Sequence, residues 1–248
     1  MVGIMSAPLR NTGYTLQLHL RGELFTPLAQ GALWWAAERT LIVSDLHLEK
    51  GSSYARRGQL LPPYDTSATL KLVETLVAEF EPDCVISLGD SFHDPLAEAR
   101  LSPAERLRIR ALTAQTDWVW VEGTHDPDPS AHLGGRGAKV LRKGDCVFRH
   151  EPTGEPGELS GHLHPVARVK GRGRSLRRKC FVTDGHRLIM PSMGTFTGGL
   201  NILDDAVSRH FSDGLMVFAA GDTQVHMVDR KLLTHDNSGA HRGGHWRL

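Results

Sequence analysis

Residues 41–48 read LIVSDLHL, an apolar run that ends on a carboxylate and an imidazole. Residues 41–43 are apolar and largely β-branched, which predicts a buried strand. In an extended backbone, side chains two positions apart leave on the same face, so we expect Asp45 and His47 to point the same way. Such a pair at the end of a strand is half of a metal site. A lone Asp-x-His is more often a helix cap with an incidental histidine, so the hypothesis depends on whether the pattern recurs.

The pattern recurs at two later strands. Residues 84–88 (CVISL) run into Gly89 and Asp90, and residues 118–121 (WVWV) run into residues 122–126 (EGTHD). Alternation of strands with helical apolar spacing favours a parallel sheet, and the carboxyl edge of such a sheet is where sites form. The expected helices cover residues 66–80 and 103–116.

The second half of the chain is predicted to contain short strands. Residues 147–149 end on His150, and residues 161–164 (GHLH) place His162 and His164 two positions apart. Residues 168–179 then form a basic run without an acidic residue. Further strands are expected at residues 15–20, 138–141, 181–182 and 187–190, with a pair within 215–228.

The length and composition predict one α/β domain. At 248 residues the chain can bury a full core, and 40% hydrophobic and 23% charged residues are ordinary for such a domain. We find no internal repeat, and expect a single domain over residues 1–233 and a disordered, polar tail over residues 234–248. Because the net charge is only +1, any argument for a polyanionic partner must be local.

The cysteine pattern and the lack of long apolar stretches indicate the cellular compartment. Cys84, Cys146 and Cys180 show no paired spacing, which fits a reducing compartment without a disulfide framework. No apolar stretch approaches the ~20 residues of a membrane span, and no secretion signal is found. We therefore expect a cytoplasmic protein with no membrane partner.

Several strand ends and loops thus contribute potential ligands. The candidates are Asp45, His47, Asp90, Thr124, His125, His150, His162 and His164. Mixed carboxylate and imidazole ligands suit Mn, Fe, Zn or Ni better than Ca or Mg. One carboxylate between two half-sites can bridge two ions about 3.5–4 Å apart, and such pairs clamp both oxygens of a phosphoryl displacement.

In this order the motifs resemble the calcineurin-like metallophosphoesterase superfamily over residues 41–165. The finer pattern is similar to the ligase-associated DNA damage response endonucleases of the PdeM family, in residues 44–51, 89–94, 149–152, 160–165 and 191–201. The resemblance implies a four-layer αββα sandwich and a single metallophosphoesterase domain. It also implies DNA as the partner and a functional link to a DNA ligase and a helicase, and leaves homo-oligomerisation open.

The resemblance also assigns roles. Asp45, His47 and His164 would hold one divalent ion, Mn being the first choice, and Asp90 would bridge to a second. That second ion would be held by His150 and His162. A hydroxide shared by the two ions would attack phosphorus in line, while His125 would stabilise charge or protonate the leaving oxygen, oriented by Asp126. His93 and Asp94 could orient ligands or simply form a turn, and both readings stay open.

Thr124 departs from the family pattern, in which an asparagine supplies an amide oxygen to the second metal. A threonine hydroxyl is shorter and a poorer ligand. We therefore expect weaker occupancy of the second site and slower turnover.

Basic residues near the motifs form the case for nucleic acid. Candidate contacts are Lys50, Arg56, Arg57, Arg172, Arg174, Arg177 and Arg178. Charge runs are usually solvated surfaces, but local Lys/Arg clusters are also what binds a phosphate backbone. We predict a DNA endonuclease of repair that prefers single strands, because no groove-reading element is found. The alternatives are a phosphodiesterase or phosphatase for a small phosphoester, and a catalytically weakened nucleic-acid-binding protein.

Overall fold

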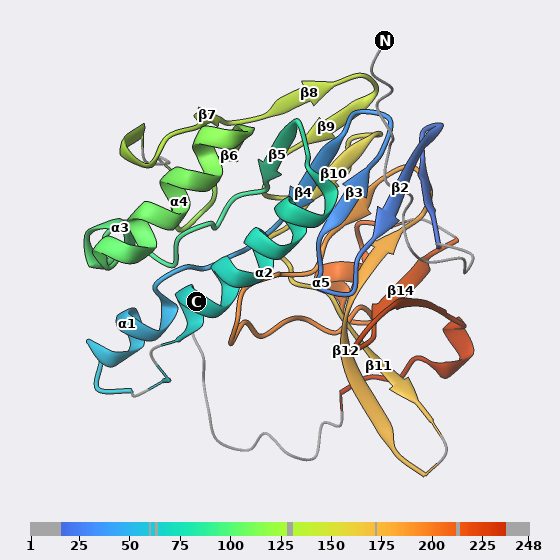
Figure 1. The fold of residues 1–248 in the computed structure, drawn as a ribbon. Helices are drawn as coiled ribbons and strands as arrows, with labels where there is room; N and C mark the ends of the chain where they lie inside the picture. Colours follow the sequence, from blue (N-terminus) through green and yellow to red (C-terminus); the bar gives the residue numbers. More distant parts are fainter. Residues whose placement is uncertain are drawn as a thin grey trace.

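The computed structural model describes residues 16–59, 61–62, 64–127, 131–171, 173–211 and 214–236. Within these residues two β-sheets face each other (Figure 1), one of seven strands and one of eight. Residues 1–12, whose sequence suggests a loose lead-in to the first strand, lie outside the described residues.

The first sheet carries the strand that opens the fold. Its order is β1-β2-β3-β4-β5-β6-β7, antiparallel from β1 to β4 and parallel from β4 to β7. Along β4, Leu41 and Val43 enter the core under the helices while Ile42 enters the core between the sheets. A strand buried on both faces must be apolar throughout, which explains the uninterrupted run. The strands are β1 (Leu18–Leu20), β2 (Glu23–Pro27), β3 (Leu33–Trp35), β4 (Thr40–Val43), β5 (Cys84–Ser87), β6 (Asp117–Val121) and β7 (Arg136–Ala138).

The second sheet contains the remaining strands. Its order is β15-β14-β12-β13-β10-β9-β8, and β11 pairs with β12 at one end. Phe148 and Phe181 project from it into the core between the sheets. The strands are β8 (Leu141–Lys143), β9 (Cys146–Phe148), β10 (Glu158–Ser160), β11 (Val166–Lys170), β12 (Ser175–Thr183), β13 (Leu188–Ile189), β14 (Met216–Ala220) and β15 (Val225–Val228).

Helices cover the outer face of the first sheet. The two long ones, α2 and α4, share a buried cluster with Trp118 and Trp120 of β6. Ser102 and Glu105 form a capping box ahead of Pro103, which explains where α4 begins. The helices are α1 (Lys50–Ala55), α2 (Asp65–Phe80), α3 (Ala97–Arg100), α4 (Pro103–Gln115) and α5 (Asp205–Ser208), with 3-10 turns η1 (Ala131–Leu133) and η2 (Arg230–Leu232).

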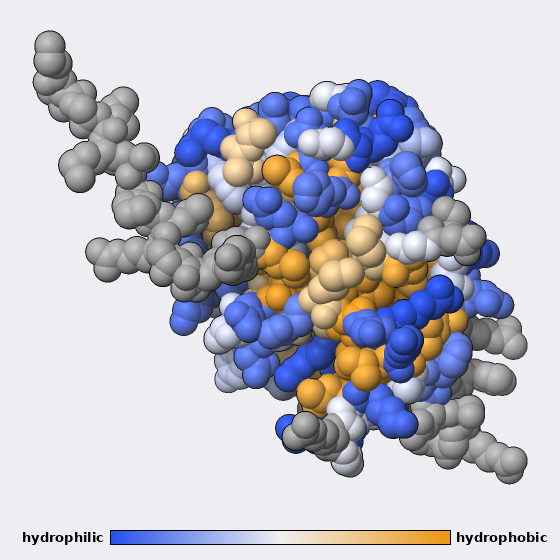
Figure 2. Space-filling view, turned by 90° about the vertical axis from the view of Figure 1, so that its right-hand side faces the viewer, coloured by the Kyte–Doolittle hydropathy of each residue, from blue (hydrophilic) through white to orange (hydrophobic). Residues whose placement is uncertain are grey.

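These layers confirm the α/β sandwich, but its fourth layer is thin. A third buried cluster lies on the outer face of the second sheet, where Ile202, Val207 and Leu233 pack on Val182 and Val217. Within the described chain only the four-residue α5 and η2 supply helical cover there. Apolar side chains accordingly gather at the surface on the right-hand side of Figure 1, as Figure 2 shows.

Two segments differ from the sequence prediction. The sequence of residues 49–63, rich in Gly, Ser, Tyr and Arg, predicts a loop, yet α1 lies within them, and the basic run forms the hairpin β11–β12. At the C-terminus, the Thr234 N–H donates to Arg168 O, so the first residues of the expected tail contact the domain. Residues 237–248 lie outside the described part. No helix in the described ranges is long and apolar enough to cross a membrane.

Candidate metal centre

The candidate ligands follow strands that end at one edge of the sandwich. Strands β4, β5 and β6 are parallel and carry Asp45, Asp90 and Thr124 past their carboxyl ends. Strands β9 and β10 of the second sheet are also parallel and lead into His150 and His162. Side chains from both sheets therefore meet at this edge.

Among the described residues, two groups of one carboxylate and two imidazoles bring their ligand atoms within 4.8 Å of one another. In the first group, His164 Nε2 lies 3.0 Å from Asp45 Oδ1 and 3.2 Å from His47 Nε2. The members of this group are Asp45, His47 and His164.

The second group is built in the same way. His150 Nε2 lies 3.3 Å from Asp90 Oδ1 and 3.2 Å from His162 Nδ1. Asp90 Oδ2 also lies 3.9 Å from His47 Nε2 of the first group, so Asp90 stands between the two. The members are Asp90, His150 and His162. This position fits the predicted bridge.

The backbone that carries these side chains is left-handed. Asp45 and His47 have φ values of 51° and 45°, so the extended backbone expected after β4 is wrong. Asp90, His162 and His164 also have positive φ, at 45°, 68° and 45°. Each left-handed non-glycine residue costs about 1–2 kcal/mol. Strain gathered at one cluster is typical of functional sites, where surrounding contacts hold it.

Backbone contacts between loops hold this conformation. The His47 N–H donates to Asp90 O and the Leu48 N–H to Ser91 O, both at 2.9 Å. The His162 N–H donates to Asp45 Oδ2 at 3.1 Å. The loops that carry Asp90 and His162 are therefore each fastened directly to the loop that carries Asp45 and His47.

Glycines at 89, 123 and 161 let the loops approach this closely. A Cβ on Gly89 would lie 2.6 Å from the His150 ring, and one on Gly123 would lie 2.2 Å from Asp90 N. A Cβ on Gly161 would lie 2.1 Å from Ser44 Oγ and 2.4 Å from Asp45 Oδ2. Glycine therefore directly precedes Asp90, Thr124 and His162, because a side chain does not fit at these three positions.

The donor set fits divalent transition-metal ions. Burial lowers the pKa of His47 to about 3, which keeps its imidazole neutral, as a ligand must be. His150 Nδ1 lies 2.9 Å from Leu88 O, and a bond there would turn Nε2 toward Asp90. Burial opposes the charged form of His150, yet contact with Asp90 and the charge of Asp45 raise its pKa to about 9, so a metal ion bound there would have to displace a proton from this imidazole.

Thr124 lies at the second group. Its hydroxyl donates to Asp90 Oδ1 at 3.3 Å and lies 3.4 Å from His150 Nε2. The residue that departs from the family pattern is thus within reach of two candidate ligands.

His125 and Asp126 point to different places. The His125 ring lies 3.8 Å from Asp90 Oδ2 and is 48% exposed, whereas Asp90 is 4% exposed. Asp126 is buried, and its Oδ2 accepts the N–H groups of Ser91 and Phe92, at 2.8 and 3.1 Å. Its Oδ1 has no hydrogen-bond partner, and burial raises the pKa of the carboxyl to about 7. Asp126 therefore fastens the loop after β5, and the expected contact that orients His125 is not found.

His93 belongs to the cluster, so of its two readings, orienting a ligand or simply forming a turn, the contacts favour the first. Its ring stacks on His125 with centroids 5.5 Å apart and lies edge-on to His47. Its Nδ1 lies 3.5 Å from His47 Nδ1. Asp94 pairs with Arg100 instead, at 2.7 Å. The sequence signal for His93 was its position three residues after Asp90, in the same loop.

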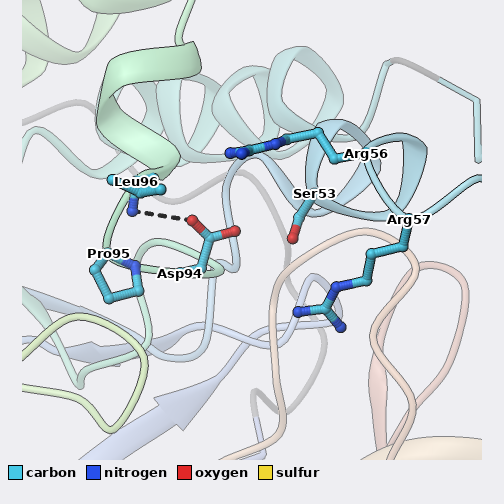
Figure 3. A pocket seen from close by; sticks show the side chains of 6 residues that line it. All are labelled: Ser53, Arg56, Arg57, Asp94, Pro95 and Leu96. Carbon is cyan, nitrogen blue, oxygen red and sulfur yellow. Dashed lines mark hydrogen bonds between the residues drawn. The ribbon is translucent and has the colours of Figure 1, made fainter.

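Arg56 and Arg57, but not Lys50, line an open pocket of about 460 Å³. Arg56 and Arg57 follow α1, and Figure 3 shows them across from Asp94 and Pro95, with Ser53 between. Burial lowers the pKa of His93 to about 4, and the charges of Lys50 and Arg57 add to this effect. Lys50 and Arg57 therefore bring positive charge to the histidine cluster.

The second set of basic residues is divided. Arg177 pairs with Asp236 and Arg178 with Asp222, both at 3.3 Å. Arg174 is exposed near the tip of the hairpin. Arg172 lies outside the described residues.

Two facing sheets with this donor cluster at their shared edge define a metal-dependent phosphoesterase. The family model for calcineurin-like phosphoesterases matches residues 38–196. The chain belongs to the calcineurin-like phosphoesterase family.

A solved structure supports this assignment. A nuclease from Pseudomonas putida, called MPE, is 31% identical with a TM-score of 0.66, and the match covers 85% of this chain and 99% of that one. A phosphoesterase from E. coli, YfcE, is 14% identical with a TM-score of 0.38, over 76% of this chain and 97% of that one, and we draw nothing from it. No curated protein matched.

Proposed function

We propose that this chain is a two-metal phosphodiesterase that cuts DNA within a strand, preferring single strands, in DNA repair. The observation that carries the proposal is the meeting of Asp45, His47 and His164 with Asp90, His150 and His162 at one edge. The relative from Pseudomonas putida, described as a nuclease, supports a nucleic-acid substrate. The mixed donor set fits manganese, iron, zinc or nickel, and manganese is our first choice from the family resemblance.

Two bound divalent ions would supply positive charge for the phosphoryl oxygens and lower the pKa of water toward neutrality. The six buried or half-buried ligands would hold them. His125 would touch the substrate, because it is the half-exposed imidazole beside Asp90. We assign His125 the role of donating a proton to the leaving oxygen. The backbone N–H of His125 donates to Asp90 Oδ1 at 2.9 Å, which ties the His125 backbone to the proposed bridging carboxylate.

The cellular setting is part of the proposal. Cys84, Cys146 and Cys180 are buried free thiols, which supports the reducing cytoplasm. A link to a DNA ligase and a helicase, and association of several copies, stay predictions of the family resemblance.

The test is cleavage of circular single-stranded DNA with manganese, since a circle has no ends and only an endonuclease can open it. We expect wild type to linearise the circle, and to cut duplex DNA more slowly. His125→Asn should slow cleavage by about a hundredfold or more, the scale of general acid catalysis. His226→Asn, which removes an exposed histidine of β15, should not.

Other outcomes favour the alternatives. Hydrolysis of a bis-aryl phosphodiester without cleavage of DNA would indicate a small phosphoester as substrate. Bound metal without any hydrolysis would indicate a weakened nucleic-acid-binding protein, an alternative that Thr124 motivates. Activity that survives Asp90→Ala would mean that the ligand assignment is wrong.

A further inference from the structure

The hairpin β11–β12 has one face that continues the inner face of its sheet. In its register, Arg168 lies opposite Arg177, and Val166 lies opposite Lys179. Opposed residues of an antiparallel pair share a face, and alternate residues along a strand do too. Arg168, Lys170, Arg177 and Lys179 are therefore on one face, which we call the inner basic face. Phe181, two positions on, enters the core between the sheets.

This face leaves the core because the hairpin extends beyond the sandwich (Figure 1). Arg178 lies on the opposite face, as does Cys180, which packs in the outer cluster. The four basic residues therefore occupy positions that would be apolar farther inside the sandwich. The charge run is an ordered surface and not an unstructured loop.

Asp236 forms ion pairs with two arginines of this face, Arg168 and Arg177. Its Oδ2 lies 3.3 Å from Arg177 Nε and its Oδ1 lies 3.8 Å from Arg168 Nη1. Like charges directly opposite one another destabilise a sheet, so a carboxylate between them is favourable. Leu233 forms a bridge with Val169, and the Thr234 N–H donates to Arg168 O, which brings Asp236 to this position.

The same face leads to the metal centre. Lys179 Nζ donates to Gly194 O at 3.0 Å, and Gly194 N donates to Asp45 O at 3.1 Å. Lys179 is largely buried, and the charges of Asp45 and Lys50 act on it. Positive charge therefore runs from Lys50 of α1, past the cluster, to the arginine pair.

We infer that Arg168 and Arg177 bind a backbone phosphate of a nucleic-acid strand flanking the cut, and that Asp236 holds their place until substrate displaces it. Arginine pairs hold carboxylates and phosphates by the same charge-assisted bonds. The side chains involved are 25%, 41% and 41% exposed, so a strand can reach them. The inference rests on the proposed function, which it deepens by locating a substrate contact. It moves the predicted contact from Arg178, on the opposite face, and from Arg174, near the tip of the hairpin, to this arginine pair.

The test measures binding of a labelled single-stranded oligonucleotide to the full chain in chelator, at several salt concentrations. Asp236→Asn should tighten binding by up to about fivefold, the strength of an exposed ion pair. Arg177→Gln should weaken it and lower the salt slope by about one. Asp222→Asn is the matched control, because it removes the same charge beside Arg178 on the opposite face.

The decisive variant combines Asp236→Asn with Arg168→Gln and Arg177→Gln. The gain from Asp236→Asn must vanish there, because no arginine remains to be released. Equal gains from Asp236→Asn and Asp222→Asn, or a gain that persists without the arginines, would overturn the inference. If wild type cuts circular DNA but these substitutions leave DNA binding unchanged, the arginine contact is wrong and the nuclease proposal stands.

If the substitutions change DNA binding as expected but wild type does not cut DNA, the nuclease proposal is wrong and the arginine contact stands.

Discussion

The Nε2 atoms of His47 and His164 lie 3.2 Å apart, although 117 positions separate the residues in the chain. Both are next to the Asp45 carboxylate, which is fully buried. Buried polar atoms need partners, and here a cation shared by all three would satisfy them. The following predictions test how the chain builds this arrangement.

Thr124→Asn should strengthen the second metal site. The amide oxygen is a better ligand than the hydroxyl, which lies 3.3 Å from Asp90 Oδ1. We expect metal affinity and phosphodiester hydrolysis to rise by about tenfold, the scale for groups around a ligand. Thr124→Val, of similar size without a hydroxyl, should lower both. Metal analysis and rates that are equal in all three proteins would defeat the idea.

Gly161→Ala should damage the first metal site. The new Cβ would lie 2.1 Å from Ser44 Oγ and 2.4 Å from Asp45 Oδ2, so those side chains must move. We expect loss of metal from this group and about 1–3 kcal/mol of lost stability, the usual cost of overpacking. Gly198→Ala is the control, since nothing lies within 4 Å of its Cβ position. Metal retention equal to that of the control would contradict the account of the close approach.

Asp126→Ala should destabilise the fold more than Asp126→Asn. The alanine leaves the buried N–H groups of Ser91 and Phe92 without an acceptor, at about 1–3 kcal/mol each. The asparagine oxygen can still accept them. Denaturant unfolding of the two variants measures the difference. If Asp126 acted by orienting His125, Asp126→Ala would slow hydrolysis and leave unfolding unchanged.

The thiols should be unreactive in the native protein. Burial raises the pKa of Cys146 to about 12 and also raises the pKa of Cys180. Because the thiolate is the reactive form, we expect a thiol reagent to label the cysteines only after unfolding. Rapid labelling of native protein at neutral pH would show that this part of the core opens readily.

The sequence predicted which residues form the site better than it predicted the backbone geometry of the site. Strand–helix alternation and the recurrence of polar residues after apolar runs were enough to predict that Asp45, Asp90 and Thr124 lie at one edge of the sheet. The left-handed backbone at Asp45 and His47 could not be predicted, because it is held by hydrogen bonds to a loop more than 40 residues away.

Local patterns also failed where tertiary contacts decide the structure. Helix α1 is the six-residue segment KGSSYA, a poor helix former, and the Gly51 N–H donates to Asp65 of another helix. Hairpin β11–β12 lacks the apolar alternation of a half-buried strand because both of its faces carry charge. Asp236, whose segment was expected to be disordered, offsets part of that charge.

The most direct test of the central claim is the metal content of three purified proteins. We predict that wild type binds about two manganese ions per chain when manganese is saturating, as a two-metal site requires, and that the second ion is held more weakly because Thr124 stands in place of the family asparagine. His164→Ala should lose the ion of the first group, and His162→Ala that of the second. A single ion in wild type, or a content that neither substitution changes, would contradict the account.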